Sequence, residues 1–317
     1  MIIISGESGR EAVPAGALIA LGCFDGLHLG HLALLRNAAE AAGRMGIPFG
    51  VWSPRGAKKA PALYAPEEKA ARLEELGASF YAEEDFARVK DMTAREFFEG
   101  VLIGRYRAAA LACGANFSFG RGREGDAQTL GRFCGEAGIP LYVTETLDLD
   151  GEPVSSAAVR RALREGDPGR AEKMLGRPYG FHTEVAEGRH VGRTLGYPTL
   201  NLPFPGGMAP ELFCRGVYAA AVTFEGGARY RAVMNVGVHP TFGEAPEPLC
   251  EAHLLDAPEA GDCYGKRVYL EFYAVLREER VFKDERELSR AIGRDEAAAR
   301  GYFDGRKKTK ETDEKKN

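Results

Sequence analysis

Two histidines three residues apart follow a glycine-rich turn near the start of the chain. Residues 22–31 read GCFDGLHLGH, after an apolar run at 17–21 and before a segment with helical spacing of apolar residues. Glycine lets the backbone approach a phosphate, and the first turn of a helix directs N–H groups and a positive dipole end at it. His28 and His31 share one face of that turn and can donate hydrogen bonds to phosphoryl oxygens. The segment predicts a nucleotide site for adenylyl transfer, with both histidines as catalytic residues.

This histidine pair has two other interpretations. Two histidines at this spacing could bind a metal, or they could form a buried, hydrogen-bonded pair without a ligand. Apart from Cys23 in the turn itself, no cysteine or third histidine lies nearby at ligand spacing. We therefore favour the phosphate-binding interpretation.

The first half of the chain alternates between strand and helix patterns. Apolar runs predict strands at 17–21, 49–52, 108–113 and 141–144, and helical spacing and capping signals predict helices at 30–42, 66–77, 126–137 and after Thr93. Such alternation is typical of a parallel, Rossmann-like sheet, in which ligands bind beyond the carboxyl ends of the strands. The turn at 22–31 and the segment 114–120 both fall at such ends.

From Phe181 onward the pattern changes to short strands separated by glycine and proline. The strands expected there lie at 217–224, 229–236, 251–255 and 268–276, which are rich in β-branched or aromatic residues. They predict a small β-barrel, closed by helical segments at 287–292 and 296–302. We expect two domains, residues 1–178 and 179–305. A disordered tail should follow at 306–317, because that segment is highly charged and has no apolar residue.

The composition is that of a soluble globular protein of 317 residues, 44% hydrophobic and 28% charged. A formal net charge of −4 without a basic stripe argues against a nucleic-acid partner, and no apolar run reaches membrane-spanning length. The six cysteines include no CxxC pair, so neither a zinc site nor a disulfide framework is expected. The first residues lack the features of a signal peptide, so we expect a cytoplasmic protein, with a monomer as its expected state.

A second motif, GRTLGYPTLN at residues 192–201, resembles the signature of riboflavin kinases. Further short motifs follow in that family's order: GVY at 216–218, NVG at 235–237, PTF at 240–242, ExH at 251–253, YGK at 264–266 and LR at 276–277. The turn at 22–31 is similar to the HxGH box of nucleotidyltransferases, in the form found in bacterial bifunctional riboflavin kinase/FAD synthetases. This resemblance covers residues 17–302. It implies a nucleotidyltransferase domain followed by a small Greek-key-type β-barrel with riboflavin kinase activity.

Riboflavin presents a neutral alcohol, so its phosphorylation by ATP needs a base for the hydroxyl proton and a metal to neutralise the phosphates. Glu251 is the candidate base, and Thr199 and Asn201 supply the hard oxygen ligands that Mg²⁺ prefers. No Walker A motif is present, so the loop 188–196 is expected to cover the phosphates. The nucleotide-binding residues expected in this region are Gly188, Gly192, Arg193, Gly196 and Pro198. Taken alone, Glu251 could be a solvent-facing strand residue and the loop an ordinary surface connection.

The phosphate of FMN is already an anionic nucleophile, so transfer of AMP to it needs aligned phosphates rather than a strong base. By resemblance, the residues that bind the nucleotide in this step are Gly22, Phe24, Asp25, Gly26, Gly30, Asn116, Ser155, Ser156 and Arg160. Two segments depart from the family pattern: residues 51–56 lack a histidine, and residues 155–160 lack a threonine and an arginine. Ser155 or Ser156 could also serve as the N-cap of a helix.

Two residues are candidates for contact with the flavin. Trp52 could stack on an aromatic ring, although a lone tryptophan at a strand end is more often part of the core. The resemblance places the segment that contains Arg277 near the flavin, with a solvated face as the alternative.

We therefore expect a bifunctional transferase that uses ATP and Mg²⁺ to phosphorylate riboflavin to FMN and then to adenylylate FMN to FAD. One alternative is a riboflavin kinase whose first domain binds nucleotide with little activity, because of the departures at 51–56 and 155–160. Another is a flavin-binding protein without turnover. Glu251, Thr199 and Asn201 argue against that alternative, because binding alone requires neither a base nor a metal.

Overall fold

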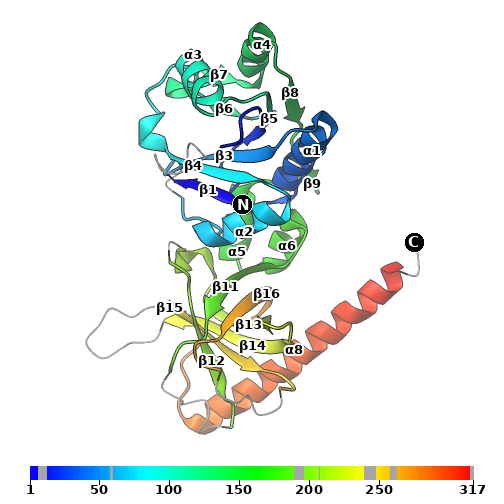
Figure 1. Ribbon diagram of the computed structural model, residues 1–317. Coiled ribbons are helices and arrows are strands. Elements are labelled where there is room, and N and C mark those ends of the chain that lie inside the picture. Colours follow the sequence, from blue (N-terminus) through cyan, green and yellow to red (C-terminus); the bar gives the residue numbers. More distant parts are fainter. Residues whose placement is uncertain are drawn as a thin grey trace. The chain divides into compact units, whose positions relative to one another are not determined.

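The computed structural model describes residues 1–5, 13–57, 60–188, 196–206, 208–238, 248–257 and 263–314 (Figure 1). The chain forms two compact units, Met1–Ser156 and Ala157–Asn317. Helices α5 (Ser156–Arg164) and α6 (Pro168–Leu175) lie at the start of the second unit, where α6 packs against strands β11 (Tyr179–Glu184) and β16 (Arg267–Glu278). The division therefore lies before this helix pair, whereas the sequence pattern places it after them.

The first unit is built on a six-stranded parallel sheet, which confirms the Rossmann-like expectation. Its strands are β1 (Ile2–Ser5), β2 (Leu18–Leu21), β3 (Phe49–Arg55), β4 (Phe80–Asp85), β5 (Ala110–Gly114) and β8 (Leu141–Thr144). They lie in the order β1-β4-β3-β2-β5-β8. The strand order reverses between β2 and β5, so the segments that follow these two strands leave the sheet at a topological switch point, where ligands bind in such folds.

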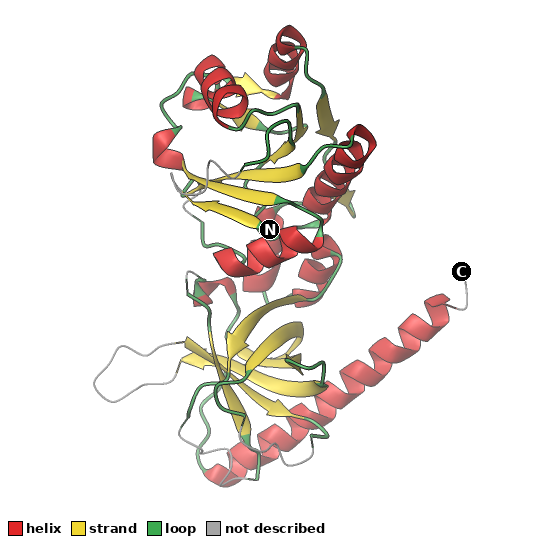
Figure 2. Cartoon of the chain, in the orientation of Figure 1, coloured by secondary structure: helices red, strands yellow, loops and turns green. Residues whose placement is uncertain are grey.

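Helices cover both faces of this sheet (Figure 2). The helices are α1 (Leu29–Met45), α2 (Pro66–Glu75), α3 (Ala94–Glu96), the π-helix η3 (Phe97–Arg105) and α4 (Ala127–Ala137). The unit also contains the short helices η2 (Phe86–Arg88) and η4 (Arg121–Arg123). Its short strands are β6 (Ser118–Phe119), β7 (Gly125–Asp126), β9 (Asp148–Leu149) and β10 (Glu152–Pro153). The expected capping signals are present. Thr93 and Glu96 form a capping box, and Pro66 is the first residue of α2.

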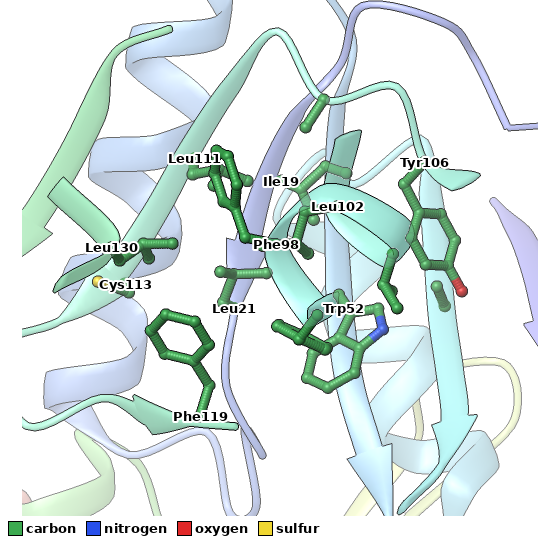
Figure 3. Close-up of a cluster of buried hydrophobic side chains, with 14 of the residues drawn as sticks. Ile19, Leu21, Trp52, Phe98, Leu102, Tyr106, Leu111, Cys113, Phe119 and Leu130 are labelled. Carbon is green, nitrogen blue, oxygen red and sulfur yellow. The ribbon is translucent and has the colours of Figure 1, made fainter. Parts of the chain in front are cut away.

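Successive residues of each strand enter two different hydrophobic clusters, one on each face of the sheet. Leu18 and Ala20 pack with side chains of α1 and α2, whereas Ile19 and Leu21 pack with side chains of η3 and α4 (Figure 3). All four are at most 1% exposed. Burial on both faces explains why these strands read as continuous apolar runs in the sequence.

The second unit contains a curled antiparallel sheet, as expected from the short strands. Its remaining strands are β12 (Thr199–Pro203), β13 (Gly216–Phe224), β14 (Arg229–Val238) and β15 (Pro248–Leu254), and a short helix, η5 (Pro210–Leu212), precedes β13. The order is β11-β16-β13-β14-β15-β12. The sheet curls back on itself where the Ala186 N–H, just after β11, donates to the Asn201 carbonyl of β12 (2.9 Å). Thr183 Oγ1 donates to the Pro203 carbonyl nearby (2.6 Å).

One helix, α8 (Glu285–Glu314), replaces the two helical segments and the disordered tail that the sequence suggests. The tail prediction is wrong for residues 306–314. Lys, Glu and Arg are good helix formers, so a charged segment can extend a helix that is already packed. Arg306 also binds Glu172 of α6 through both terminal nitrogens, and its guanidinium lies 4.8 Å from the centre of the Tyr273 ring. None of the helices in the described ranges is long and apolar enough to cross a membrane.

The burial of the cysteines predicts which thiols react. Burial raises the pKa of Cys113 to about 12 and that of Cys134 to about 11, and it raises the pKa of Cys250 as well. These thiols stay protonated at pH 8 and have little exposed surface, so they should react slowly. In the folded protein a thiol reagent should rapidly modify Cys23, Cys214 and Cys263, which are partly exposed, and unfolding should release all six. Rapid modification of Cys113 or Cys250 before unfolding would contradict this assignment.

Two candidate active sites

The turn between β2 and α1 has an unusual backbone. Phe24 and Leu27 adopt φ angles of 47° and 44°, and Gly26 between them has a φ of 82°. A positive φ costs a non-glycine residue on the order of 1–3 kcal/mol and persists only where surrounding contacts impose it. Gly26 itself cannot be replaced easily, because an added Cβ would lie 2.5 Å from Leu63 Cδ1.

Three hydrogen bonds impose this turn. Ser53 Oγ donates to the Cys23 carbonyl (3.1 Å), and Ser156 Oγ donates to the Asp25 carbonyl (2.8 Å). The Leu63 N–H donates to Asp25 Oδ1 (2.8 Å). The Asp25 carboxylate and the Ser156 hydroxyl therefore hold the backbone of the turn. Ser156 is also the first residue of α5, and Ser155 directly precedes it.

The two histidines lie together at the start of α1. His28 is the N-cap residue, and its Nδ1 accepts a hydrogen bond from the His31 N–H (3.3 Å). In the neutral ring this arrangement places the proton on Nε2, as a donor. The His28 and His31 rings stack with centroids 3.6 Å apart, and Phe24 lies edge-on to His31 at 5.3 Å. The structure thus brings together two imidazoles, the N-terminus of a 17-residue helix and the glycine-rich turn.

Other residues expected at this site lie on neighbouring elements. Leu21 pairs with Cys113, so the segment after β5 leaves the sheet beside the 22–31 turn. Asn116 is in that segment, and its Oδ1 lies against Gly114, where an added Cβ would be 3.1 Å away. Arg160 lies on α5 in the second unit.

Trp52 lies in the core rather than on a surface. It is 4% exposed and packs edge-on against Phe97 of η3 at 5.0 Å (Figure 3). Its indole N–H is buried and makes no hydrogen bond to any described residue. The packing of Trp52 therefore agrees with the alternative interpretation of the sequence, in which this residue belongs to the core.

A largely buried polar cluster that the sequence did not suggest lies between α2 and the carboxyl end of β4. Glu83 Oε1 accepts hydrogen bonds from Tyr81 Oη (2.8 Å) and Lys69 Nζ (3.2 Å). Burial lowers the pKa of Lys69, although Glu83 opposes that shift. Burial and the Glu83 charge raise the pKa of Tyr81. The cluster joins α2 to β4. No local pattern pointed to it, because Lys69 lies 14 residues before Glu83 on another element.

In the second unit, a row of polar residues crosses three neighbouring strands. Glu251 of β15 lies directly opposite Asn201 of β12 on one side and Asn235 of β14 on the other. Directly opposite residues point to the same face of a sheet. The adjacent residues Cys250 and Ala252 are fully buried and face the barrel interior. The row Asn201–Glu251–Asn235 therefore lies on the outer face of the sheet, where Glu251 and Asn235 are partly exposed.

Gly188 packs directly against this row. A Cβ added at Gly188 would lie 1.8 Å from Asn201 Nδ2, and Asn201 is 8% exposed. Gly196 has a φ of 83°, which favours glycine, and Pro198 lies just before β12. Gly192 and Arg193, which the sequence also proposes for nucleotide binding, lie outside the described residues.

Thr199 and Asn201 are two positions apart on β12, so their side chains point to the same face of the sheet. Their hydroxyl and amide oxygens suit a hard divalent cation. Among the described residues, no group of three or more His, Cys, Asp or Glu side chains could hold a metal.

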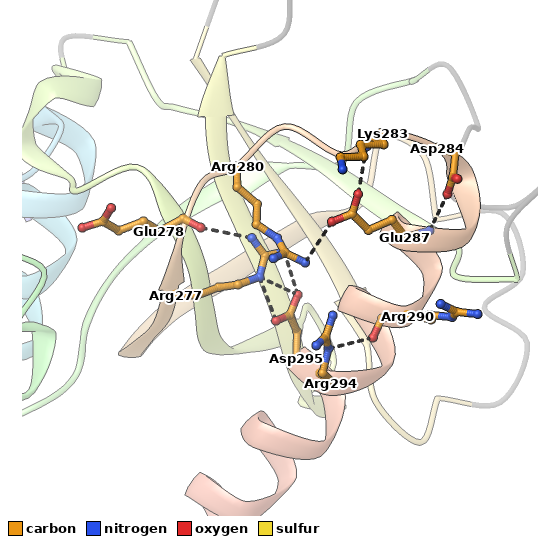
Figure 4. A network of polar contacts seen from close by, with 9 residues as sticks. All are labelled: Arg277, Glu278, Arg280, Lys283, Asp284, Glu287, Arg290, Arg294 and Asp295. Carbon is orange, nitrogen blue, oxygen red and sulfur yellow. Dashed lines mark hydrogen bonds and ion pairs between the residues drawn. The ribbon is translucent and has the colours of Figure 1, made fainter.

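Arg277 makes a salt bridge within the protein. Its Nε and Nη2 bind both oxygens of Asp295 (2.8–3.2 Å), and its Nη1 donates to the Glu278 carbonyl (3.0 Å) (Figure 4). Asp295 is buried, with its side chain 8% exposed. These contacts differ from the solvated face considered as an alternative. Through the salt bridge to Asp295, Arg277 helps to hold α8 against the barrel.

One further residue, Glu279, borders the row and was missed. An added Cβ at Gly237 would lie 2.5 Å from Glu279 Oε1 and 3.0 Å from Asn235 Nδ2. The Glu279 and Asn235 side chains therefore both lie against Gly237. The NVG motif at 235–237 marked the position, but only strand register connects Asn235 with Glu251.

Comparison with known proteins gives the same division of the chain into two parts. A family model described as FAD synthetase matches residues 10–158, and one described as riboflavin kinase matches residues 175–303. The bifunctional riboflavin kinase/FMN adenylyltransferase of Escherichia coli K12 is 35% identical over 302 residues, covering 92% of this chain and 95% of that protein. The proteins of that name from Pseudomonas fluorescens and Bacillus subtilis are 34% and 32% identical, covering 95% and 93% of this chain and 97% and 95% of their own lengths. The chain belongs to the bifunctional riboflavin kinase/FMN adenylyltransferase family.

Membership in this family confirms the expected enzyme with both activities. It favours that expectation over a kinase alone, because both family models match. A solved structure described as a macrolide-efflux protein from Streptococcus pneumoniae has a TM-score of 0.82 and 26% identity, covering 95% of this chain and 99% of its own. The whole two-part architecture is therefore also found in a solved structure.

The contact between Gly188 and Asn201 predicts the effect of one methyl group. In the Gly188→Ala variant the added Cβ must displace Asn201. If Asn201 takes part in the reaction, a displacement of about 1 Å costs roughly 100-fold in rate. We expect riboflavin kinase kcat to fall by about that factor, while FAD formation from supplied FMN stays unchanged.

The Gly206→Ala variant is the matched control, because an added Cβ there meets nothing within 4 Å. Both rates should be measured by chromatographic separation of riboflavin, FMN and FAD. Equal kinase rates in the two variants would show that the position of Asn201 is unimportant.

Proposed function

We propose that the turn at 22–31 catalyses adenylyl transfer from ATP to FMN. The stacked pair His28–His31 at the N-terminus of α1 carries this assignment. The FMN phosphate attacks the α-phosphorus of ATP, and pyrophosphate leaves. His28 Nε2–H and the His31 ring donate to the phosphoryl oxygens as negative charge develops there, and the N–H groups of the helix add to that stabilisation. Gly22, Gly26 and Gly30 let the backbone approach the phosphates.

The remaining residues proposed for this step act around the phosphates. Phe24 fills the space beneath His31, and Asp25, Ser155 and Ser156 shape or cap the turn. Asn116 and Arg160 are proposed to bind the nucleotide directly. Stacking of the flavin on Trp52 is not proposed, because Trp52 is 4% exposed and packs against Phe97.

We propose that the outer face of the barrel phosphorylates riboflavin. Glu251, flanked by Asn201 and Asn235, carries this assignment. Its carboxylate takes the proton of the riboflavin hydroxyl as that oxygen attacks the γ-phosphorus of ATP, and ADP leaves. Gly188, Gly192, Arg193, Gly196 and Pro198 are proposed to line the nucleotide, and Arg277 to support the flavin side through Asp295.

A magnesium ion held by Thr199 and Asn201 would neutralise negative charge on the nucleotide phosphates. The protein's own part is to keep these two oxygens on one face of β12, next to Glu251. The contact of Gly188 with Asn201 supports that arrangement.

Two substitutions should separate the activities. Glu251→Gln keeps the size of the side chain but removes the base, so kcat for FMN formation should fall by about 10²–10⁴-fold. His28→Asn keeps a good N-cap residue but removes the Nε2 donor, so FAD formation from FMN should fall by about 10²–10³-fold. A chromatographic time course with riboflavin, ATP and Mg²⁺, and a second with FMN and ATP, measures both rates.

Each variant is the control for the other. The Glu251→Gln variant should still make FAD from supplied FMN, and the His28→Asn variant should accumulate FMN. If either substitution reduced both rates equally in folded protein, the assignment of one reaction to each unit would be wrong.

A further inference from the structure

A histidine of the barrel contacts the residue directly before β12. His253 lies on β15, its Nδ1 is 2.9 Å from the carbonyl oxygen of Pro198, and its Nε2 is 2.8 Å from Glu296 Oε1 of α8. Carbonyl and carboxylate oxygens only accept hydrogen bonds. Nδ1 therefore donates to the Pro198 carbonyl, and Nε2 lies within hydrogen-bond distance of the Glu296 carboxylate.

The bond to Glu296 is partly buried, and the bond to Pro198 is more exposed. The side chains of His253 and Glu296 are 14% and 25% exposed. The Tyr197 ring lies edge-on to the imidazole at 5.5 Å, and a Cβ added at Gly293 of α8 would lie 3.6 Å from Tyr197 Oη. Charge-assisted hydrogen bonds in such surroundings are stronger than neutral ones at a surface.

The position of Pro198 makes its carbonyl important. Proline has no N–H, so the carbonyl is the only backbone group through which Pro198 can be held by a hydrogen bond. The next residue, Thr199, lies directly opposite His253, and Asn201 lies directly opposite Glu251. The His253 bond therefore fixes the beginning of the strand that carries both proposed metal ligands.

The helix that supports His253 is itself anchored. Asp295, the residue before Glu296, forms the bidentate salt bridge to Arg277 of β16 (Figure 4). Two consecutive carboxylates of α8 thus bind two different strands of the barrel. Because Asp295 fixes the rotation of α8, Glu296 is held where it can orient the imidazole.

We propose that His253 is a positioning residue for riboflavin phosphorylation, acting through the Pro198 carbonyl to hold Thr199 and Asn201 beside Glu251. Glu296 orients the ring and contributes less than the bond to Pro198. The inference rests on the proposed roles of Thr199 and Asn201 in that reaction. Residues that orient ligands of a reacting centre are typically worth about 10–100-fold in activity.

Two substitutions of His253 test the two hydrogen bonds of the imidazole separately. The amide nitrogen of asparagine can take the place of Nδ1, and that of glutamine the place of Nε2. His253→Asn should keep the bond to Pro198 and retain kcat for FMN formation within about threefold, whereas His253→Gln should lose about 10–100-fold. His253→Phe, which keeps the ring against Tyr197, should resemble His253→Gln. The exposed His182 of β11 provides the matched control, His182→Gln, with no change expected.

Amide hydrogen exchange of the full chain gives a second readout that needs no substrate. Peptides covering β12 should exchange faster in His253→Gln and His253→Phe than in the wild type, and at the wild-type rate in His253→Asn. Equal kcat in the Asn and Gln variants, or unchanged exchange in β12 of the Gln variant, would overturn the proposal. The Glu251→Gln variant distinguishes a failure of the role proposed for His253 from a failure of the proposed kinase site. If Glu251→Gln abolishes FMN formation while His253→Gln is normal, only the role of His253 is wrong.

Discussion

A backbone carbonyl outside regular secondary structure needs a hydrogen-bond donor, and leaving one buried without it costs about 1–3 kcal/mol. Side chains supply these donors around both candidate sites. Ser53 and Ser156 hold the carbonyls of Cys23 and Asp25 in the first unit, and His253 holds that of Pro198 in the second. At the other end of β12, Thr183 holds the carbonyl of Pro203. The shape of each site thus depends on residues that need not touch a substrate.

The two units match the different demands of two phosphate chemistries. A phosphate nucleophile is already charged, so its reaction needs donors that gather negative charge. In the mechanism proposed above, a helix N-terminus with two imidazoles provides them. An alcohol must lose a proton as it reacts, so its reaction needs a base within reach. The proposed base is Glu251, which cross-strand pairing places between two amides.

Local signals in the sequence predicted the elements well. The apolar runs at 17–21 and 108–113 became buried parallel strands, and the Thr93–Glu96 pair formed its capping box. The alternation of strand and helix patterns also predicted that the 22–31 turn lies at the carboxyl end of a strand. Each of these features depends on residues close together in the chain, which is what periodicity and capping patterns report.

Features that depend on distant partners were not predicted. The charged segment that begins at Arg306 looked like a free tail, because Glu172, the partner of Arg306, lies on another helix. Arg277 was considered either for the flavin or for solvent, but Asp295 lies 18 residues away on α8 and occupies its guanidinium. The row Asn201–Glu251–Asn235 follows from register, which no single segment contains. The candidate residues could thus be found from the sequence, whereas their supports could not.

The contacts of α8 also limit how this helix can change in evolution. Asp295, Glu296 and Arg306 each bind a partner on a different element of the barrel unit. An inserted residue turns the rest of an α-helix by about 100° and moves it about 1.5 Å along its axis. One insertion between Glu296 and Arg306 would therefore turn Arg306 away from Glu172 while the two carboxylates kept their partners. Relatives should vary this stretch by substitution and keep its length constant.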